Sequence, residues 1–250
     1  MSTDLYFKGM HEHVGYFPTW LPNVALHPGD YGTIAGGRFT RLGALDEAPF
    51  SLPLERRRGA MLQRLSYQSK SGIEVVMGGA SERLGRARIE IASSQAFLFE
   101  AQGLRAVTLE NLGQLGVELV GLWREGRWKT EWVIVSEVQE VDGLAVVVAD
   151  EGNAELELEA KVALGDTNQL ADPNAELRIA RRRGRVLDFL GFGRGRAPLT
   201  PLYKLARLKR RLWSEPTWSN VRDDRLAEDD SALEAVAFDT FIADAESCAK

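Results

Sequence analysis

The chain has 250 residues, of which 44% are hydrophobic and 27% are charged, and its net charge is −5 at pH 7. These proportions are ordinary for a folded globular protein, so they exclude general disorder, and the length allows one large domain or two small ones. The only cysteine, Cys248, excludes a disulfide framework within one chain and fits a reducing compartment such as the cytoplasm.

The first 60 residues are predicted to be rich in turns, because five prolines interrupt them. Two short strands are expected at residues 31–34 and 38–42, and a short helix at 54–65 with its Arg56-Arg57-Arg58 face in solvent. The first ten residues contain no apolar run behind a basic start, so we expect no secretory signal. No stretch of the chain stays apolar for the roughly 18 residues that a membrane-spanning helix needs.

From residue 72 the hydrophobic residues recur at every second position, which predicts strands at 73–77, 86–91 and 96–101. In the strand 86–91 apolar and charged side chains alternate, so one face of the sheet is expected to be apolar and the other to face water. A helix is predicted at 108–123 with Thr108 as its cap, because large apolar residues recur there at helical spacing. We interpret it as a core helix packed against a sheet.

Three more strands are predicted at 131–141, 144–149 and 154–162. The turn-forming residues between them predict that the three strands form an antiparallel meander. In the last of them, glutamates alternate with apolar residues more sharply than anywhere else in the chain. A further hairpin is expected from 176–180 to 185–190.

After residue 191 a flexible break leads to a basic amphipathic stretch at 202–212, whose leucines recur at helical spacing. The tail contains a capping-box pattern at 231–234, which predicts a short terminal helix with acids on its outer face. Together these elements predict an α+β fold that is predominantly antiparallel β-sheet with a few packed helices. We expect a β-rich domain at residues 1–222 and an acidic C-terminal tail or short helix at residues 223–250.

The most informative feature of the chain is the sorting of its charges by position. Residues 178–211 contain twelve basic residues and one acid, Asp188, whereas residues 223–246 contain nine acids and one base, Arg225. Like charges at this density repel one another unless a counter-charge lies nearby, so we expect the tail to cover the basic segment. The basic residues are Arg178, Arg181, Arg182, Arg183, Arg185, Arg194, Arg196, Lys204, Arg207, Lys209, Arg210 and Arg211, and the masking acids are Asp223, Asp224, Glu228, Asp229, Asp230 and Glu234.

Three interpretations of the basic segment remain open. The first is a solvated surface with the tail as its counter-ion, which is what most charge runs are. The second is a surface for anionic lipid, because leucines under a row of lysines and arginines, with Trp213 and Trp218 nearby, suit a membrane interface. The third is nucleic acid, which Arg194, Arg196 and Tyr203 could contact through phosphates and stacking. The acidic balance of the whole chain argues against nucleic acid.

The sequence contains no nucleophile elbow, zinc-protease motif or phosphate-binding loop. His11-Glu12-His13 would place two imidazoles on one side of a strand, but two nitrogens supply only half of a tetrahedral metal site, and His27 lies in a proline-rich turn. With three histidines and one cysteine, there are few candidates for a pair of nucleophile and base. We therefore expect no catalytic residues, no cofactor, no metal and no enzymatic activity.

Several features follow one another along the chain: a proline-rich start, Arg41-Leu-Gly-Ala-Leu, the alternating strand 86–91, the strands of 131–162, Thr200-Pro201-Leu202 before a basic stretch, and a separable tail. In this order they resemble the pore-forming gasdermins, particularly the short bacterial members. The resemblance implies a mostly β fold with charged amphipathic hairpins, one or two helices against a twisted sheet and an inhibitory C-terminal peptide. Bacterial gasdermins typically carry a lipidated cysteine near the N-terminus, whereas the only cysteine here is Cys248.

From the charges and this resemblance we predict a non-enzymatic effector whose basic surface is masked by its acidic tail. Release of the tail would let that surface meet an anionic membrane, and the resemblance implies homo-oligomerisation and a pore, in bacterial antiviral defence. Arg222 and Arg225 flank two acids in a polar link, so we expect cleavage there by an activating protease of trypsin-like specificity. The protein would then be cytoplasmic until it associates with the membrane. The alternative is a soluble assembly module that binds a partner protein or nucleic acid without membrane activity.

Overall fold

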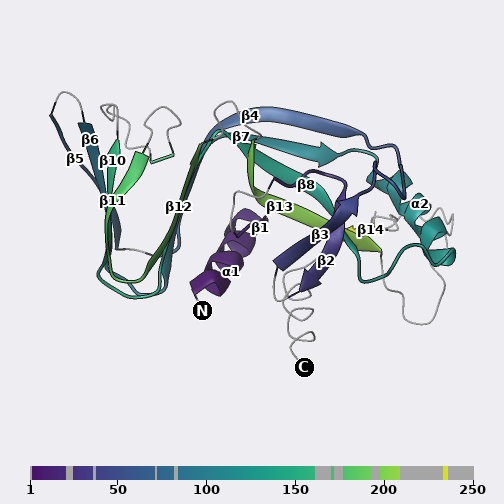
Figure 1. Ribbon diagram of the computed structural model, residues 1–250, viewed down its shortest axis with the longest axis horizontal. Coiled ribbons are helices and arrows are strands. Elements are labelled where there is room, and N and C mark those ends of the chain that lie inside the picture. The colour runs from purple at the N-terminus through teal and green to yellow at the C-terminus, as the bar shows by residue number, and fades with distance from the viewer. Residues whose placement is uncertain are drawn as a thin grey trace, which may run out of the picture. The chain divides into compact units, whose positions relative to one another are not determined.

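The structure is a computed structural model that describes residues 2–20, 25–35, 38–70, 72–81, 84–160, 170–171, 177–192, 198–208 and 233–235 (Figure 1). This part of the chain is mostly antiparallel sheet with two helices, which confirms the predicted α+β fold. The helices are α1 (Ser2–Val14) and α2 (Leu112–Arg124). The strands are β1 (Phe17–Pro18), β2 (Asp30–Ala35), β3 (Arg38–Ala44), β4 (Arg56–Gln68), β5 (Ile73–Ser81), β6 (Leu84–Ile91), β7 (Ala96–Leu109), β8 (Val133–Val141), β9 (Gly143–Ala149), β10 (Ala154–Ala160), β11 (Leu177–Arg183), β12 (Val186–Phe192), β13 (Leu199–Leu208) and β14 (Leu233–Ala235).

The residues divide into two compact units. The first comprises Met1–Ala25, Gly59–Ala106 and Gln139–Leu202, and the second comprises Leu26–Arg58, Val107–Val138 and Tyr203–Lys250. The chain passes from one unit to the other between Ala25 and Leu26 and within β4, β7, β8 and β13. Both units therefore draw on the expected domain 1–222, and the described residues of the tail, 233–235, belong to the second unit.

The described strands form a large sheet and a small sheet. The large sheet has the order β1-β13-β8-β7-β9-β12, with β14 also paired with β13, β4 with β7, and β2 with both β8 and β3. The small sheet has the order β11-β10-β6-β5. Short turns join β4 to β5, β6 to β7, β9 to β10 and β11 to β12, so each strand of the small sheet continues a strand of the large sheet. We call these four turns the corners.

Each corner contains one residue in the left-handed backbone conformation. These residues are Gly72 (φ 90°), Gln95 (φ 51°), Asn153 (φ 58°) and Gly184 (φ 78°). Glycine adopts this conformation freely and asparagine tolerates it, whereas a residue such as glutamine pays about 1–2 kcal/mol. The corners are therefore encoded locally, because at three of the four the sequence supplies a residue suited to the reversal.

In the first unit, β7 and β9 lie between α1 and the small sheet. Successive residues of a strand point to opposite faces, and β7 follows this rule. The ring of Phe97 meets that of Tyr6 in α1, with centroids 5.2 Å apart, whereas Leu98 packs in the core shared with the small sheet. Gly9 permits the close approach of α1, because a Cβ at that position would lie 2.8 Å from the Phe97 ring.

In the second unit, α2 packs into a core built on Leu115 and Leu119, which are at most 1% exposed. Aromatic rings extend this core, with Trp128 and Trp132 meeting edge to face at 5.1 Å between centroids. The carboxylate of Asp30 is buried at the start of β2, where it accepts hydrogen bonds from Arg41 Nε and from the backbone N–H of His27, each at 2.8 Å. These bonds fix the base of the β2–β3 hairpin, which confirms the two short strands predicted there.

The predicted meander of residues 131–162 is wrong. β8 and β9 both pair with β7 rather than with each other, and β10 belongs to the small sheet. The predicted hairpin from 176–180 to 185–190 is also wrong, because β11 pairs with β10 and β12 pairs with β9. Turn-forming residues mark the place where a strand changes direction, but they do not identify the strand with which it pairs.

Two segments predicted as helices, and a third whose leucines recur at helical spacing, contain strands. Residues 54–65 contribute to β4, residues 202–208 to β13, and the described residues of the tail form β14. β13 pairs with β1, β8 and β14. Its residues are largely buried on both faces, so its leucines show no alternation. A short apolar run of this kind fits a helix and a buried strand equally well.

The N-terminus forms α1, with Tyr6 and Met10 fully buried. The internal helix predicted at 108–123 is present as α2, but it begins at Leu112 after Asn111 because β7 continues to Leu109. Thr108 is therefore a strand residue and not a cap.

Candidate functional site

The small sheet is the candidate functional site because its strands are amphipathic. Its inner face is apolar: in register, Ile89 of β6 lies between Val75 of β5 and Leu156 of β10. Leu158 of β10 lies between β6 and Ile179 of β11 in the same way. Ile89, Leu156 and Leu158 are at most 1% exposed.

This inner face packs on residues of the large sheet that include Leu98, Ala145 and Val147. Burial of one isoleucine or leucine side chain contributes about 1.5–3 kcal/mol. Because several such side chains are buried together, apolar packing is the main force that holds the small sheet against the large one in the first unit.

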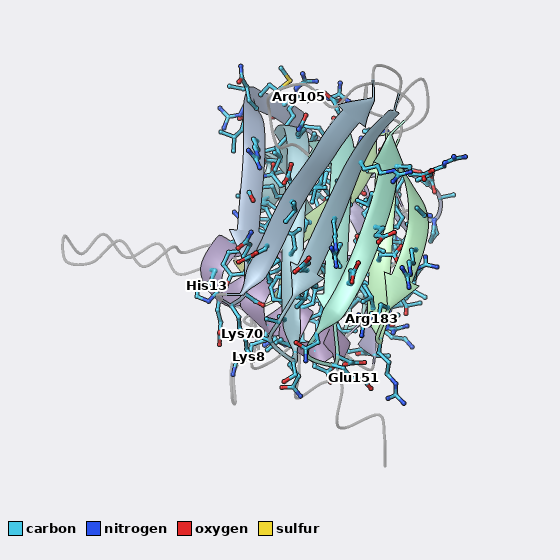
Figure 2. All side chains as sticks on the ribbon, turned by 90° about the vertical axis from the view of Figure 1, so that its left-hand side faces the viewer. Lys8, His13, Lys70, Arg105, Glu151 and Arg183 are labelled. Carbon is cyan, nitrogen blue, oxygen red and sulfur yellow. The ribbon has the colours of Figure 1, made fainter. Side chains whose placement is uncertain are left out.

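The outer face of the small sheet is a charged grid (Figure 2). In strand order from β5 to β11, the row nearest the corners is Glu74, Glu90, Glu155 and Arg183, the second row is Val76, Arg88, Glu157 and Arg181, and the third is Gly78, Arg86, Glu159 and Arg178. The glutamates of β10 therefore stand between a mixed column on β6, which has Glu90, Arg88 and Arg86, and a basic column on β11. Opposite charges in neighbouring columns support the pairing of the strands.

Ion pairs connect the columns of the grid. Arg88 Nε lies 2.8 Å from Glu155 Oε1 and 3.1 Å from Glu90 Oε1, and Arg178 Nη2 lies 2.9 Å from Glu159 Oε2. The hydrogen bond from Arg88 lowers the pKa of Glu155, and the same bond raises the pKa of Arg88. The first row places three carboxylates side by side, and Arg88 offsets part of their repulsion by reaching two of them.

A cleft of about 370 Å³ opens on this face, lined by Val76, Arg86, Arg88, Glu157, Glu159 and Ala180 among others. Its charged groups include both signs, so its electrostatics favour neither an anion nor a cation. The exposed valine, 46% accessible, gives the cleft an apolar side as well.

The described residues of the predicted basic surface are divided between the two units. Arg178, Arg181, Arg182, Arg183 and Arg185 belong to β11 and the following corner in the first unit, whereas Lys204 and Arg207 belong to β13 in the second. Arg194, Arg196, Lys209, Arg210 and Arg211 lie outside the described residues. The structure therefore does not gather the described members into one patch within either unit.

Acids that are near in the fold neutralise many of these basic residues. Arg182 makes a two-pronged hydrogen bond to Asp188, with Nε 2.6 Å from Oδ1 and Nη2 3.2 Å from Oδ2, and this pairing raises the pKa of Arg182. Arg185 lies 3.3 Å from Glu151, and Lys204 lies 3.4 Å from Glu137. These partners could not be predicted from charges summed along the chain, because they lie across strands.

The tail meets the basic segment at one described place. β14 pairs antiparallel with β13, with Ala206 opposite Ala235, Arg207 opposite Glu234 and Leu208 opposite Leu233. The other masking acids, Asp223, Asp224, Glu228, Asp229 and Asp230, and the expected cleavage residues Arg222 and Arg225 lie outside the described residues. Masking by the tail thus stays a prediction for them, and β14 adds a backbone contact that the charge pattern alone did not predict.

A buried carboxylate links three segments of the first unit. Glu100 of β7 has a side chain that is only 3% exposed, and its Oε2 lies 3.1 Å from Arg64 Nη2 on β4. Its Oε1 accepts a hydrogen bond of 3.4 Å from the backbone N–H of Ala171, which is fully buried in the connection between β10 and β11. We call this contact the Glu100 latch. The sequence signal for it is a single acid in the otherwise apolar run 96–101.

The histidine pair of the N-terminus does not take the arrangement expected of it. His11 and His13 lie in α1, where residues two apart point to different sides of a helix. Their rings stack on Phe17 and Tyr67, with centroids 4.6 and 5.1 Å apart. Among the described residues, we find no group of three or more histidines, cysteines or acids that could hold a metal ion. None of the helices in the described ranges is long and apolar enough to cross a membrane.

Comparison with models of known protein families finds no family that matches the chain. Comparison with curated proteins finds no significant relative.

Proposed function

We propose that the protein is a non-enzymatic, membrane-active effector whose small sheet opens away from the large sheet and enters an anionic membrane. The observation that carries this proposal is the order of the strands. β4, β7, β9 and β12 are successive neighbours in the large sheet, and β5, β6, β10 and β11, which continue them through the corners, are neighbours in the same order.

Opening the four corners would convert two stacked ladders into one ladder of longer strands, and every strand would keep its neighbours. The backbone hydrogen bonds between strands could then persist during the change. The cost would fall on the apolar contacts between the two ladders, on the corners and on the Glu100 latch.

The amphipathic strands support a membrane as the destination. A strand of about 9–11 residues crosses a bilayer when tilted, and β5 and β6 have 9 and 8 residues. The apolar inner face, which packs against the protein core in the closed form, would contact lipid instead, and the charged grid would stay in contact with water. Backbone groups at the edges of the ladder need partners inside a bilayer, so the active form is expected to be a homo-oligomer that surrounds an aqueous pore.

We propose that the tail controls this change. β14 covers the end of β13, and cleavage at Arg222 or Arg225 by an activating protease would separate the tail from the rest of the chain. The basic residues of segment 178–211 would then attract the anionic membrane surface. Before cleavage the protein would remain in the cytoplasm, and a role in bacterial antiviral defence follows from the resemblance to gasdermins.

Dye leakage from vesicles tests the proposal. The chain truncated after Arg222 is expected to release dye from vesicles that contain anionic lipid, and the full-length chain is expected to release little. Vesicles of zwitterionic lipid alone are the control for charge. If the truncated chain releases no more dye than the full-length chain, the membrane proposal is wrong.

Two neighbouring valines provide a matched pair for the insertion step. Val75 packs against the inner core, whereas Val76 is 46% exposed on the outer face. In the truncated chain, Val75→Glu is expected to abolish leakage because it puts a charge on the face that meets lipid, and Val76→Glu is expected to keep it. Circular dichroism of both variants verifies that they are folded. Equal leakage from the two folded variants would contradict the assignment of the faces.

A gel-shift titration across salt concentrations distinguishes this effector from a soluble nucleic-acid-binding module. Binding that weakens steeply with salt, without association with vesicles, would favour the module.

A further inference from the structure

β4 has a long edge with no described strand beside it. The strand has 13 residues and pairs with β7, and no other pairing of β4 is present among the described strands. All of its residues are exposed except Leu65 and Tyr67, which are half-buried. Met61 and Leu62 are 54% and 57% exposed, and as neighbours on a strand they point to opposite faces. A long exposed edge with apolar residues on both faces is a place where another strand adds.

The charges of β4 restrict which strand can add. The strand contains four arginines, Arg56, Arg57, Arg58 and Arg64, and no acid. Three of them already have acidic partners in their own chain: Arg56 lies 2.8 Å from Asp46, Arg57 lies 2.7 Å from Glu110, and Arg64 lies 3.1 Å from Glu100. An added strand therefore does not need to be acidic. It needs to avoid placing a further positive charge opposite an arginine.

We propose that two copies of this chain pair antiparallel through β4, about a two-fold axis that passes beside Leu62. This register pairs all 13 residues of each strand and places every arginine opposite an uncharged residue. Arg56, Arg57, Arg58 and Arg64 lie opposite Gln68, Tyr67, Ser66 and Ala60 of the partner subunit, respectively. Leu62, the most exposed of the large apolar side chains described on β4, packs against Leu62 of the partner subunit. A self-complementary interface of this kind is the commonest form of protein dimer.

Neighbouring registers are disfavoured by charge. A two-fold axis normal to the sheet places one residue opposite itself, so the register changes in steps of two. An axis at Met61 puts Arg58 opposite Arg64 of the partner subunit, and an axis at Ala60 puts Arg56 opposite Arg64 of the partner subunit. Like charges directly opposite each other destabilise a strand pair. An axis at Gln63 avoids this clash but leaves the first two residues of each strand without a partner.

The dimer does not depend on the membrane proposal, because the small sheet and the tail take no part in it. Sedimentation of the full-length chain over a wide range of concentrations is expected to give a mass twice the 27.7 kDa of the chain. Leu62→Glu is expected to halve that mass, because two glutamates would then meet at the axis. Leu187→Glu, which changes an exposed leucine of β12 that is 43% accessible, is the matched control and is expected to leave the mass unchanged.

Disulfide cross-linking tests the register itself. In a Cys248→Ser background, which removes the only native cysteine, Leu62→Cys is expected to form a covalent dimer on mild oxidation. Directly opposed strand residues have Cα atoms about 4.5–5.5 Å apart, within the range that a disulfide bridges. Met61→Cys is expected to form no covalent dimer, because Met61 lies opposite Gln63 of the partner subunit and is out of register with its own copy.

A chain that sediments as a monomer at every concentration would overturn the β4 dimer. So would a dimer that Leu62→Glu does not dissociate, or cross-linking through Met61→Cys that is as efficient as through Leu62→Cys.

Discussion

Replacement of Glu100 by alanine and by glutamine separates the two contacts of the latch. The carboxylate accepts one hydrogen bond from the buried backbone N–H of Ala171 and one from Arg64, whose side chain is 42% exposed. Alanine removes both acceptors. Glutamine keeps a carbonyl oxygen for the N–H of Ala171, but it replaces the carboxylate oxygen opposite Arg64 with an uncharged NH2 group and so loses the ion pair and its hydrogen bond.

The two losses differ in size. A buried N–H left without a partner costs about 1–3 kcal/mol. Arg64 can turn to water, so the loss of its ion pair costs at most about 1 kcal/mol, the value typical of partly exposed pairs. We therefore expect Glu100→Ala to lower the free energy of unfolding by about 1–4 kcal/mol and Glu100→Gln to lower it by at most about 1 kcal/mol.

Urea denaturation measures both changes, and hydrogen exchange at the amide of Ala171 reports the local contact. In Glu100→Ala that amide is expected to exchange faster by more than the global change in stability explains, whereas in Glu100→Gln it is expected to stay protected. The latch would be refuted if the alanine variant were as stable as the native chain. It would also be refuted if the Ala171 amide exchanged equally fast in the two variants.

Gly184→Ala is expected to lower the free energy of unfolding by about 1 kcal/mol in thermal unfolding, because alanine is strained at φ 78° and its Cβ would lie 3.3 Å from the backbone of β10. Gly126→Ala is the control and should cost less, because its φ is similar, 71°, but a Cβ there would have no atom within 4 Å. Tyr6→Phe is expected to raise the free energy of unfolding by about 1 kcal/mol, because the hydroxyl is buried with no hydrogen-bond partner among the described residues; a loss of stability would contradict this. The hydrogen bond from Arg88 lowers the pKa of Glu155, so the ionised Glu155 stabilises the fold above the usual carboxylate pKa, and this stabilisation is lost as the pH falls through the pKa of the folded state. The unfolding free energies measured at neutral and at acidic pH should therefore differ less in Arg88→Gln than in the native chain.

Strands with one buried face and one solvent-exposed face could be predicted from the sequence. Residues 86–91 and 154–160 alternate because one side of each meets the core and the other meets water, and both are strands of the small sheet. Residues 199–208 gave no such signal, because β13 is largely buried on both faces and its spacing imitates a helix. β4 failed for the opposite reason: both of its faces are exposed, so no core selects its apolar positions.

Partners in space were harder to predict than elements. The basic run 178–185 was visible in the sequence, but the acids that neutralise it belong to β10, β12 and the corner before β10. Charge summed along the chain pointed to the tail because the tail is acidic and follows next. Only the register of β10 against β11 shows that Glu155, Glu157 and Glu159 stand beside Arg183, Arg181 and Arg178.

The small sheet and the tail are held by different contacts. β14 pairs with β13, and in the described part of the chain it pairs with no strand of the small sheet. In the proposed mechanism, separation of β14 is therefore expected to leave the apolar face, the corners and the Glu100 latch in place. Opening of the small sheet then requires another apolar environment for Ile89, Leu156 and Leu158, which are buried in the core. Lipid hydrocarbon is such an environment, because side chains that move into it from the protein core are not exposed to water. In the truncated chain, the amide of Ala171 should accordingly stay protected from hydrogen exchange in solution and lose that protection only when anionic vesicles are added. Loss of protection without vesicles would show that the tail, and not the apolar face, keeps the small sheet closed.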